Sequence, residues 1–366
     1  MTVDEPARAT GKGDSVTPPH RAPARPNLED VAALSGVSRA TVSRVVNGQS
    51  TVAEDLRVRV QLAIDELGYV PNQAARALMT RRSDAVALVA SEPAARVFGD
   101  PFFSGIVRGV STETNRAGLQ LVLMMAQDFE DLARVKRFLK SSPVDGVMLI
   151  SGHEGDGLPE ELQRLATPYV IGGRPTASDS GAPYVDSENF LGAEIATRHL
   201  MSLGRRTIGS VTGPLDMPAG VDRRAGFAHA LGSAFREELV ESGDFTQRGG
   251  EFAAARLLER VPDLDGLFAA SDLMALGALA ALRRAGRRVP EDVALVGFDD
   301  NEFASTADPP LTTVRQDPMI MGRAMVRLYL ARHRPDIEVA PEPGIPDVTG
   351  LDHLILPVSL VVRDSA

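Results

Sequence analysis

The chain has 366 residues, with 39 lysines and arginines against 49 aspartates and glutamates, so its formal net charge is −10. Over the whole chain this acidic balance disfavours a polyanionic partner. The chain contains no cysteine, which excludes disulfides, cysteine-bound metal centres and thiol nucleophiles. Apolar runs stay short of the roughly 18 residues that span a membrane, and the first residues lack the apolar core of a secretory signal. We therefore expect a cytoplasmic protein without membrane contact.

The amino-acid composition of the chain changes near residue 27. Residues 1–26 are rich in proline and in small or charged residues, so we predict a disordered tail. From 27 to 71 the apolar residues recur at helical spacing in blocks separated by Gly36, Gly48 and Gly68. This pattern predicts a small helical domain.

Two of these blocks predict a helix-turn-helix. Asn27 can cap the first helix, Gly36 can form the turn, and Ser38 can cap the second helix. The second helix would bury its valines and expose Arg39 and Arg44, which can each donate two hydrogen bonds to guanine. Two short helices joined by glycine also occur in proteins that bind no DNA. From the pattern alone, both interpretations stay open.

A longer stretch of residues resembles a known family. The segment DVAALSGVSRATVSRVVN, followed by LGYVPNQAARAL, is similar to the N-terminal domain and hinge of the lactose/galactose-repressor (LacI/GalR) family of bacterial transcription regulators. The resemblance implies a domain at 27–71 that binds double-stranded DNA at a palindromic operator. The operator contacts that it implies in this domain are Ser38, Arg39, Ala40, Ser43, Arg44 and Asn47.

Residues 72–82 are predicted to form a hinge helix and linker. A helix of two turns starting at Asn72 is too short to be stable alone. In the family two such helices pair in a dimer and enter the minor groove, where each inserts an apolar wedge that kinks the DNA. Leu78 occupies the wedge position, although an ordinary core leucine is the alternative. The hinge contacts that the resemblance implies are Asn72, Ala75, Arg76 and Leu78.

From residue 83 onward, strand-like apolar runs alternate with amphipathic segments of helix length. This alternation predicts repeated βα units with parallel sheets. About ten strands fit two doubly wound lobes better than one sheet. We place lobe one at about 83–186 and 315–356, and lobe two at about 187–314 and 357–366. The predicted strands lie at 85–90, 119–124, 145–150, 168–173, 207–211, 265–270 and 293–298.

Signatures of catalysis or metal binding are absent from the sequence. There is no GxGxxG, GxxxxGK[ST], GxSxG or HExxH motif, and none of the six histidines has metal-ligand spacing to another. We therefore predict no enzyme activity, no cofactor and no metal. His153 lies in a glycine-rich loop, where we expect solvated surface. Two lobes with a cleft between them predict binding of a small molecule at the carboxyl ends of the strands.

The family resemblance extends over residues 83–366. The motifs DPFFSGIVRGV, VDRRAGF, ASDLMALG, VGFDD and PPLTTVRQD resemble the family's effector domain. The implied fold is a small all-α helix-turn-helix domain plus an α/β two-lobed domain like periplasmic sugar-binding proteins. Arg223 would donate to ligand oxygens and Asp299 would accept from ligand hydroxyls, which suits a neutral polyhydroxylated ligand. The effector contacts that the resemblance implies are Phe102, Phe103, Arg223, Phe245, Ser271 and Asp299.

Several of these residues have a purely structural interpretation. Phe103 could belong to the core, and Asp299 could cap the end of a strand. Arg223 could pair with Asp222 or Asp272 on a helix surface, where an ion pair contributes about 0–1 kcal/mol.

The end of the chain departs from the family. Residues 335–353 form a proline-rich, acidic stretch that we interpret as an inserted surface loop before one last strand, ILPVSLVVR. No leucine heptad follows that strand, so we expect a homodimer, which matches the symmetry of a palindromic operator.

The sequence predicts a transcriptional regulator, a repressor of carbohydrate-uptake or catabolism genes that a sugar or sugar derivative controls. The alternatives are a solute-binding receptor or a sugar-acting enzyme on the same scaffold. The acidic net charge of the whole chain does not exclude DNA binding, because the charge differs between the two parts of the chain. Residues 1–82 carry 11 Lys and Arg against 9 Asp and Glu, a net +2, and the rest carry 28 against 40, a net −12. The acid belongs to the effector body, and the small domain meets DNA through a few arginines.

Overall fold

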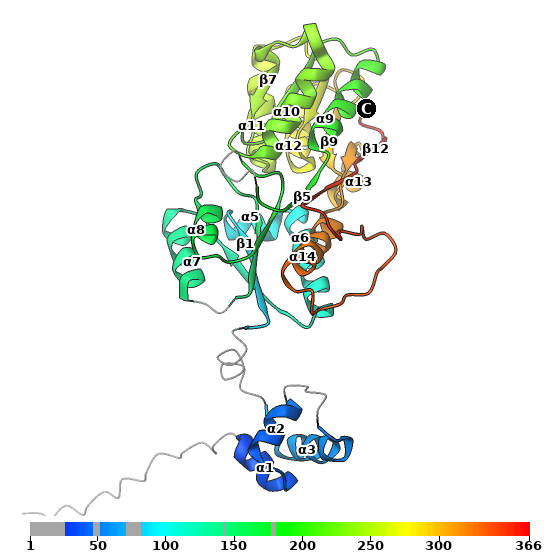
Figure 1. Cartoon of the computed structure of the whole chain (residues 1–366). Helices are drawn as coiled ribbons and strands as arrows, with labels where there is room; N and C mark the ends of the chain where they lie inside the picture. The colour runs from blue at the N-terminus through cyan, green and yellow to red at the C-terminus, as the bar shows by residue number, and fades with distance from the viewer. Residues whose placement is uncertain (1–25, 47–51, 71–81, 142–143, 177–180) are drawn as a thin grey trace, which may run out of the picture. The chain divides into compact units, whose positions relative to one another are not determined.

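The computed structural model describes residues 26–46, 52–70, 82–141, 144–176 and 181–366. The chain divides into two compact units, Met1–Met79 and Thr80–Ala366, and each is described by itself (Figure 1). The predicted tail, apart from Pro26, and all of the predicted hinge helix up to residue 81 lie outside the described residues. Among those described, no helix is both long and apolar enough to span a bilayer.

The described residues of the first unit form three helices. They are α1 (Leu28–Ser35), α2 (Arg39–Val46) and α3 (Glu54–Leu67). Asn27 caps α1 by accepting hydrogen bonds from the backbone of Glu29 and Asp30, and the Asp30 carboxylate accepts from the Asn27 N–H in return. Gly36 then ends α1 at φ 65°. The buried core that joins the three helices consists of Val31, Val42, Val60, Ala63 and Tyr69.

The second unit is built on two six-stranded sheets. Sheet one, in lobe one, is entirely parallel, with the strand order β11-β5-β4-β3-β1-β2. Its strands are β1 (Ala85–Ala90), β2 (Gln120–Met125), β3 (Gly146–Ile150), β4 (Tyr169–Gly172), β5 (Tyr184–Ser187) and β11 (His353–Leu356). Sheet two, in lobe two, has the order β12-β10-β9-β8-β6-β7, and only β12 runs antiparallel. Its strands are β6 (Ile208–Thr212), β7 (Val240–Ser242), β8 (Gly266–Ala269), β9 (Ala294–Asp299), β10 (Thr312–Arg315) and β12 (Ser359–Val361).

Helices cover both faces of sheet one because its strand residues alternate between the faces. Leu88 packs with Ile106 and Met325 on one face, and Val89 packs with Val135 on the other. These partners come from α6 (Pro101–Arg116) and α14 (Pro318–His333) and, opposite, from α7 (Phe129–Ser141) beside α8 (Leu158–Arg164), as Figure 1 shows. The short α5 (Ala94–Gly99) leads into α6.

Lobe two repeats this arrangement. Helix α9 (Asn189–Ser202) packs against α10 (Pro218–Leu231), and α11 (Gln247–Arg260) packs against α12 (Asp272–Arg284). The remaining helical segments are α13 (Glu302–Thr306) and two 3-10 turns at Gly232–Ala234 and Glu237–Leu239. The predicted fold class, a helix-turn-helix domain plus a two-lobed α/β domain, is confirmed.

The end of the chain differs from the sequence prediction. The single last strand predicted in ILPVSLVVR is wrong, because Pro357 separates β11 in sheet one from β12 in sheet two. Proline has no N–H to continue a ladder, so the chain leaves one sheet there and enters the other. The loop before β11 is held to the helices by Glu342, which pairs with Arg116 and, at 2.7 Å, with Arg323.

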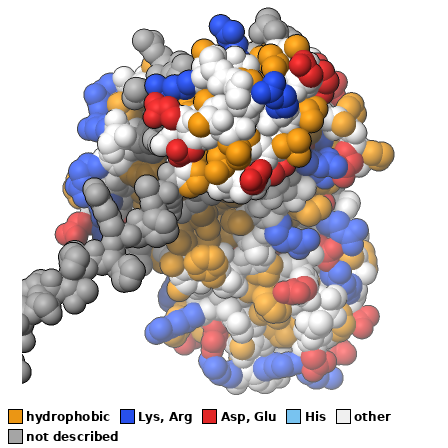
Figure 2. All heavy atoms as spheres, turned by 90° about the horizontal axis from the view of Figure 1, so that it is seen from below, with side chains coloured by type: hydrophobic (Ala, Val, Ile, Leu, Met, Phe, Trp, Pro, Cys, Tyr) orange, Lys and Arg blue, Asp and Glu red, His pale blue; other side chains and the backbone are white. Residues whose placement is uncertain are grey.

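On the face shown in Figure 2, acidic and basic side chains of the described residues are interspersed. Long-range attraction of charged partners to this face is therefore modest.

Candidate functional site

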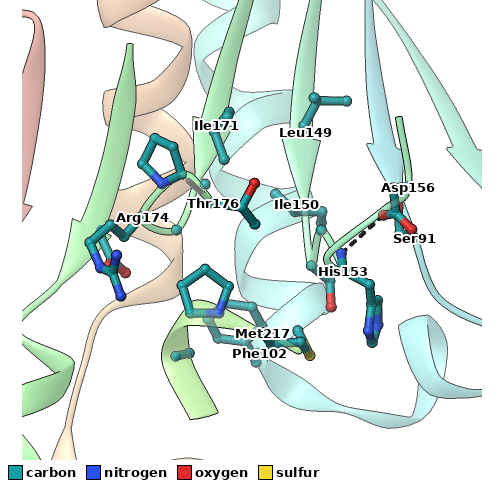
Figure 3. A pocket seen from close by; sticks show the side chains of 18 of the residues that line it. Ser91, Phe102, Leu149, Ile150, His153, Asp156, Ile171, Arg174, Thr176 and Met217 are labelled. Carbon is teal, nitrogen blue, oxygen red and sulfur yellow. Dashed lines mark hydrogen bonds between the residues drawn. The ribbon is translucent and has the colours of Figure 1, made fainter. Parts of the chain in front are cut away.

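A cleft lies where strands of both sheets end (Figure 3). From lobe one it is lined by Ser91 after β1, His153 after β3 and Arg174 after β4; from lobe two it is lined by Met217 after β6 and Ser271 after β8. Its open volume is about 1180 Å³, solvent at the mouth included. The carboxyl ends of parallel strands are where open α/β sheets bind ligands.

Arg223 is the central cation of the cleft. The residue lies on α10 and is only 5% exposed. Its Nε donates to Asn189 Oδ1 at 2.9 Å and its Nη1 to the Ala270 carbonyl at 2.5 Å, with Asp299 Oδ1 3.7 Å from Nη1. The guanidinium also lies 3.6 Å from the centroid of the Phe298 ring. Burial lowers the pKa of Arg223 from its ordinary value, while the nearby aspartates raise it.

Asp299 is the acidic partner of Arg223. It ends β9 with φ 122°, in a region that non-glycine residues rarely adopt, and Gln316 Nε2 donates to its Oδ1 at 2.7 Å. Burial raises its pKa to about 7 even though Arg223 acts in the opposite direction. The alternative partners of Arg223 are engaged elsewhere. Asp222 forms an ion pair with Arg174 at 2.7 Å, and Asp272 accepts hydrogen bonds from Thr313 and Asn301.

Two further carboxylates in the cleft escaped the sequence analysis. Asp100 caps α6 by accepting from the Phe102 N–H at 2.9 Å, and burial raises its pKa. Asp186, on β5, accepts from Asn189 Nδ2 at 2.9 Å, and burial raises its pKa to about 6. Asn189 therefore connects Asp186 to Arg223. Asp100 directly precedes Pro101, where α6 begins, and Asp186 lies three residues before Asn189, where α9 begins.

The aromatic residues predicted for the site line the same cleft. Phe103 is 1% exposed and belongs to the core of lobe one, so its structural interpretation and its place in the cleft both hold. Phe102 lies edge-on to it at 5.4 Å between ring centroids. Phe245 of lobe two is buried at φ 61°, with the Arg96 guanidinium 5.4 Å from its ring centroid. The structure thus brings the predicted effector residues together, including Ser271, which also caps α12.

The expectation that His153 is solvated surface is wrong. His153 lines the cleft, and only 26% of its side chain is exposed. Its Nδ1 lies 2.8 Å from Asp216 Oδ2, and its Nε2 lies 3.5 Å from Glu92 Oε1. These carboxylates, Glu92 first, raise the pKa of His153 to about 9. The glycines around it indicated a loop but not that the loop follows β3 into the cleft.

In the first unit, the predicted DNA contacts that the structure describes extend along α2, from Ser38 just before the helix to Arg44 in its last turn. Ser38, Arg39, Ala40 and Arg44 are exposed, and Ser43 is half-buried. Ser38 Oγ accepts from the Thr41 N–H at 3.1 Å, which caps α2. The other predicted contacts, which lie outside the described residues, are Asn47, Asn72, Ala75, Arg76 and Leu78.

Two family models match the chain. Residues 27–72 match the bacterial regulatory proteins of the lacI family, and residues 197–366 match a periplasmic binding protein-like domain. The chain is 49% identical over 312 residues to the HTH-type transcriptional regulator CelR of Thermobifida fusca, covering 84% of this chain and 92% of that protein. It is 31% identical over 309 residues to the ribose operon repressor of Escherichia coli K12, with 83% and 92% covered.

Solved structures agree with these relatives. A CelR–cellobiose complex superposes with a TM-score of 0.72 at 45% identity, covering 93% of this chain and 100% of that chain. The Lac repressor dimer bound to operator and the anti-inducer ONPF superposes with a TM-score of 0.79 at 27% identity, covering 93% and 99%. The predicted likeness of the two-lobed domain to periplasmic binding proteins is confirmed.

Proposed function

Because the chain belongs to the LacI family of bacterial regulatory proteins, we propose that it represses carbohydrate-uptake or catabolism genes and that a sugar in the cleft sets its operator affinity. Its relatives are transcriptional regulators and repressors, which favours this function over a solute receptor or a sugar-acting enzyme. The site of action is the cytoplasm, where bacterial operator DNA lies.

The pairing of Arg223 with Asp299 carries the effector half of this proposal. A guanidinium that donates and a carboxylate that accepts, 3.7 Å apart in a cleft lined by both lobes, can hold neighbouring hydroxyls of one sugar ring. The rings of Phe102 and Phe245 add apolar surface for the C–H face of the sugar. Arg223 and Asp299, together with Asp100, Asp186 and Asn189, form the proposed binding floor.

The effector is an uncharged sugar. Each arginine that lines the cleft already faces a carboxylate: Arg96 faces Glu92, Arg174 faces Asp222, and Arg223 faces Asp299. A sugar phosphate would have to break one of these ion pairs and leave a carboxylate near its own charge. CelR, which forms a complex with cellobiose, supports a neutral disaccharide, and cellobiose is the first candidate.

The response to the effector requires two arrangements of the lobes. A ligand that contacts both lobes favours the arrangement in which both sets of contacts are made, and the lobe orientation sets the separation of the two hinges (residues 72–82) in a homodimer. Shifting such an equilibrium from 1:99 to 99:1 requires about 5.5 kcal/mol of differential binding. The proposed domains are the DNA-binding domain at 27–71, this hinge, and the effector and dimerisation domain at 83–366.

DNA binding follows from the first unit. We assign base recognition to Arg39, Ala40 and Arg44, and the minor-groove wedge to Leu78, in a homodimer on a palindromic operator. The Lac repressor dimer on its operator supports this arrangement.

The effector class is tested by calorimetric titration of the full-length protein with cellobiose, a monosaccharide and a phosphorylated disaccharide. We expect cellobiose to bind and the phosphorylated sugar not to bind. Equal binding of the phosphorylated sugar would contradict the proposed effector class. Footprinting on the protein's own promoter region tests the DNA half.

A further inference from the structure

We propose that His153 is a latch between the lobes: its imidazolium bridges Glu92 of lobe one and Asp216 of lobe two and holds the cleft closed around the effector. This inference rests on the proposed function only in that the cleft binds an effector. The latch itself is a property of the two lobes, so it can be measured without any ligand.

The latch joins two loops that follow strands of different sheets. His153 follows β3 of sheet one, and Asp216 follows β6 of sheet two. The 2.8 Å contact between His153 Nδ1 and Asp216 Oδ2 is accompanied by a backbone hydrogen bond of 2.9 Å from the Glu154 N–H to the Asp216 carbonyl. The connection between the lobes therefore involves a side chain and the main chain at the same place.

Lobe one holds the imidazole in position. The backbone N–H of His153 donates to Asp156 Oδ2 at 3.0 Å, which is the dashed line in Figure 3 and fixes the main chain that carries the ring. On the other side of the ring lies Glu92, which is 4% exposed and accepts from Ser151 Oγ at 2.6 Å. With the ring fixed from its own lobe, the contact to Asp216 forms with little further loss of conformational freedom.

The charge on the imidazole decides the strength of the latch. The ionisable groups that face it are the carboxylates of Glu92 and Asp216, and Arg96 lies beside Glu92. The two carboxylates outweigh the opposing effect of burial and raise the pKa of His153 to about 9. The ring is therefore charged at neutral pH, and the attraction to Asp216 weakens as the pH rises through 9.

A second ion pair joins the two lobes across the cleft, and its cation does not lose its charge in this pH range. Arg174 of lobe one donates to Asp222 of lobe two through Nε at 3.0 Å and Nη2 at 2.7 Å. In Figure 3, Arg174 and His153 lie on opposite sides of Phe102 and Met217. A guanidinium stays charged across the accessible pH range. The Arg174 pair thus serves as a control for any contact between the lobes that does not depend on pH.

The ligand-free test measures the distance between the lobes. The chain has no cysteine, so Ser141→Cys on α7 and Ser233→Cys beside α10 give one label in each lobe of a protomer, both at exposed positions, and mixing with excess unlabelled protein leaves at most one labelled protomer in a dimer. Electron–electron distance measurements from pH 7 to 10 should show the closed population falling as the pH rises through 9. With His153→Gln the closed population should be smaller and constant across this range, whereas Arg174→Gln should lower it but keep the pH dependence. Equal pH profiles for the unsubstituted protein and His153→Gln would overturn the latch.

The ligand-bound test measures cellobiose affinity by calorimetry at pH 7. We expect His153→Gln to weaken binding about three- to tenfold, the loss of one charge-assisted hydrogen bond at a half-exposed site. His229→Gln is the matched control, because His229 lies 3.4 Å from Glu194 within lobe two, and it should not alter the affinity. If His153→Gln does not fold, Asp216→Asn replaces it. Unchanged affinity in the folded variant would contradict the latch, whereas failure of the unsubstituted protein to bind any sugar would contradict the proposed function and leave the distance measurement to decide the latch.

Discussion

Arg223 and Asp299 face each other at the floor of the cleft, where both side chains are nearly buried and 3.7 Å separates Nη1 from Oδ1. The guanidinium contacts the side chains of Asn189 and Asp299 and the carbonyl of Ala270, so it joins three segments of the chain. Two of its roles are therefore inseparable: it offers donors to a ligand, and it neutralises a buried carboxylate.

Replacement of Arg223 tests whether this residue binds the effector at the floor of the cleft. Arg223→Lys keeps the charge but loses the planar set of donors, so we expect effector affinity to fall about a hundredfold, or about 3 kcal/mol. Operator affinity without effector should be unchanged, because the operator contacts lie in the first unit. Arg224→Lys is the control, since Arg224 is paired with Glu237 at the surface. Unchanged effector affinity in Arg223→Lys would show that the planar set of donors on Arg223 does not bind the effector.

The pH dependence of stability tests the environment of Asp299. Its pKa is raised to about 7 by burial, from an ordinary value of about 3.9. The native state therefore holds this proton more tightly than the unfolded state, so the stabilising effect is complete below pH 4 and is lost as the pH rises through 7. Urea denaturation at several pH values should show the unsubstituted protein losing stability relative to Asp299→Asn over this range. If the free energy of unfolding changes with pH in the same way for both proteins, the pKa of Asp299 is not raised in the native state.

The wedge assignment separates specific from non-specific DNA binding. Leu78→Ala should weaken specific operator binding, because alanine is too small to fill the space between the base steps of the kinked DNA. The salt-dependent non-specific affinity should stay unchanged. Leu62→Ala is the control, since Leu62 is an exposed leucine on α3. Anisotropy titrations on operator and on unrelated DNA at several salt concentrations make the comparison. Equal losses on both DNAs would show that Leu78 is not a wedge.

The crossing of α6 and α14 depends on a small residue. A Cβ on Gly109 would lie 2.2 Å from the Met319 carbonyl oxygen. Gly109→Ala should therefore push the helices apart and destabilise the chain by about 1–3 kcal/mol. Gly99→Ala, where a Cβ would have no neighbour within 4 Å, should be neutral to within about 0.5 kcal/mol. Urea denaturation measures both, and equal stability of the two variants would contradict the packing.

Local patterns predicted much of this molecule. Glycines and capping residues such as Asn27 act within a few positions of themselves, so the helices of the first unit could be predicted from their neighbourhood. Apolar runs likewise predicted the central strands of both sheets. The resemblance to a family, rather than spacing, brought Arg223 and Asp299 to one site.

The features that were missed depend on contacts between distant segments. The cross-lobe contact of His153 requires knowing that residue 216 follows a strand in the other sheet. Lobe boundaries at 186 and 356 were predicted, but the hydrogen bond of Asp186 with Asn189 and the end of β11 before Pro357 depend similarly on how the chain continues into the other lobe. No local pattern encodes such contacts, because they are set by the packing of both sheets.

Operator affinity as a function of cellobiose concentration tests the central claim most directly. The full-length protein is titrated onto its footprinted operator by anisotropy, with and without the sugar. We propose that the sugar releases the repressor from the genes for its own use, so we predict that saturating cellobiose weakens operator binding at least about tenfold, or about 1.4 kcal/mol. Cellobiose that binds the cleft but leaves operator affinity unchanged would contradict the account.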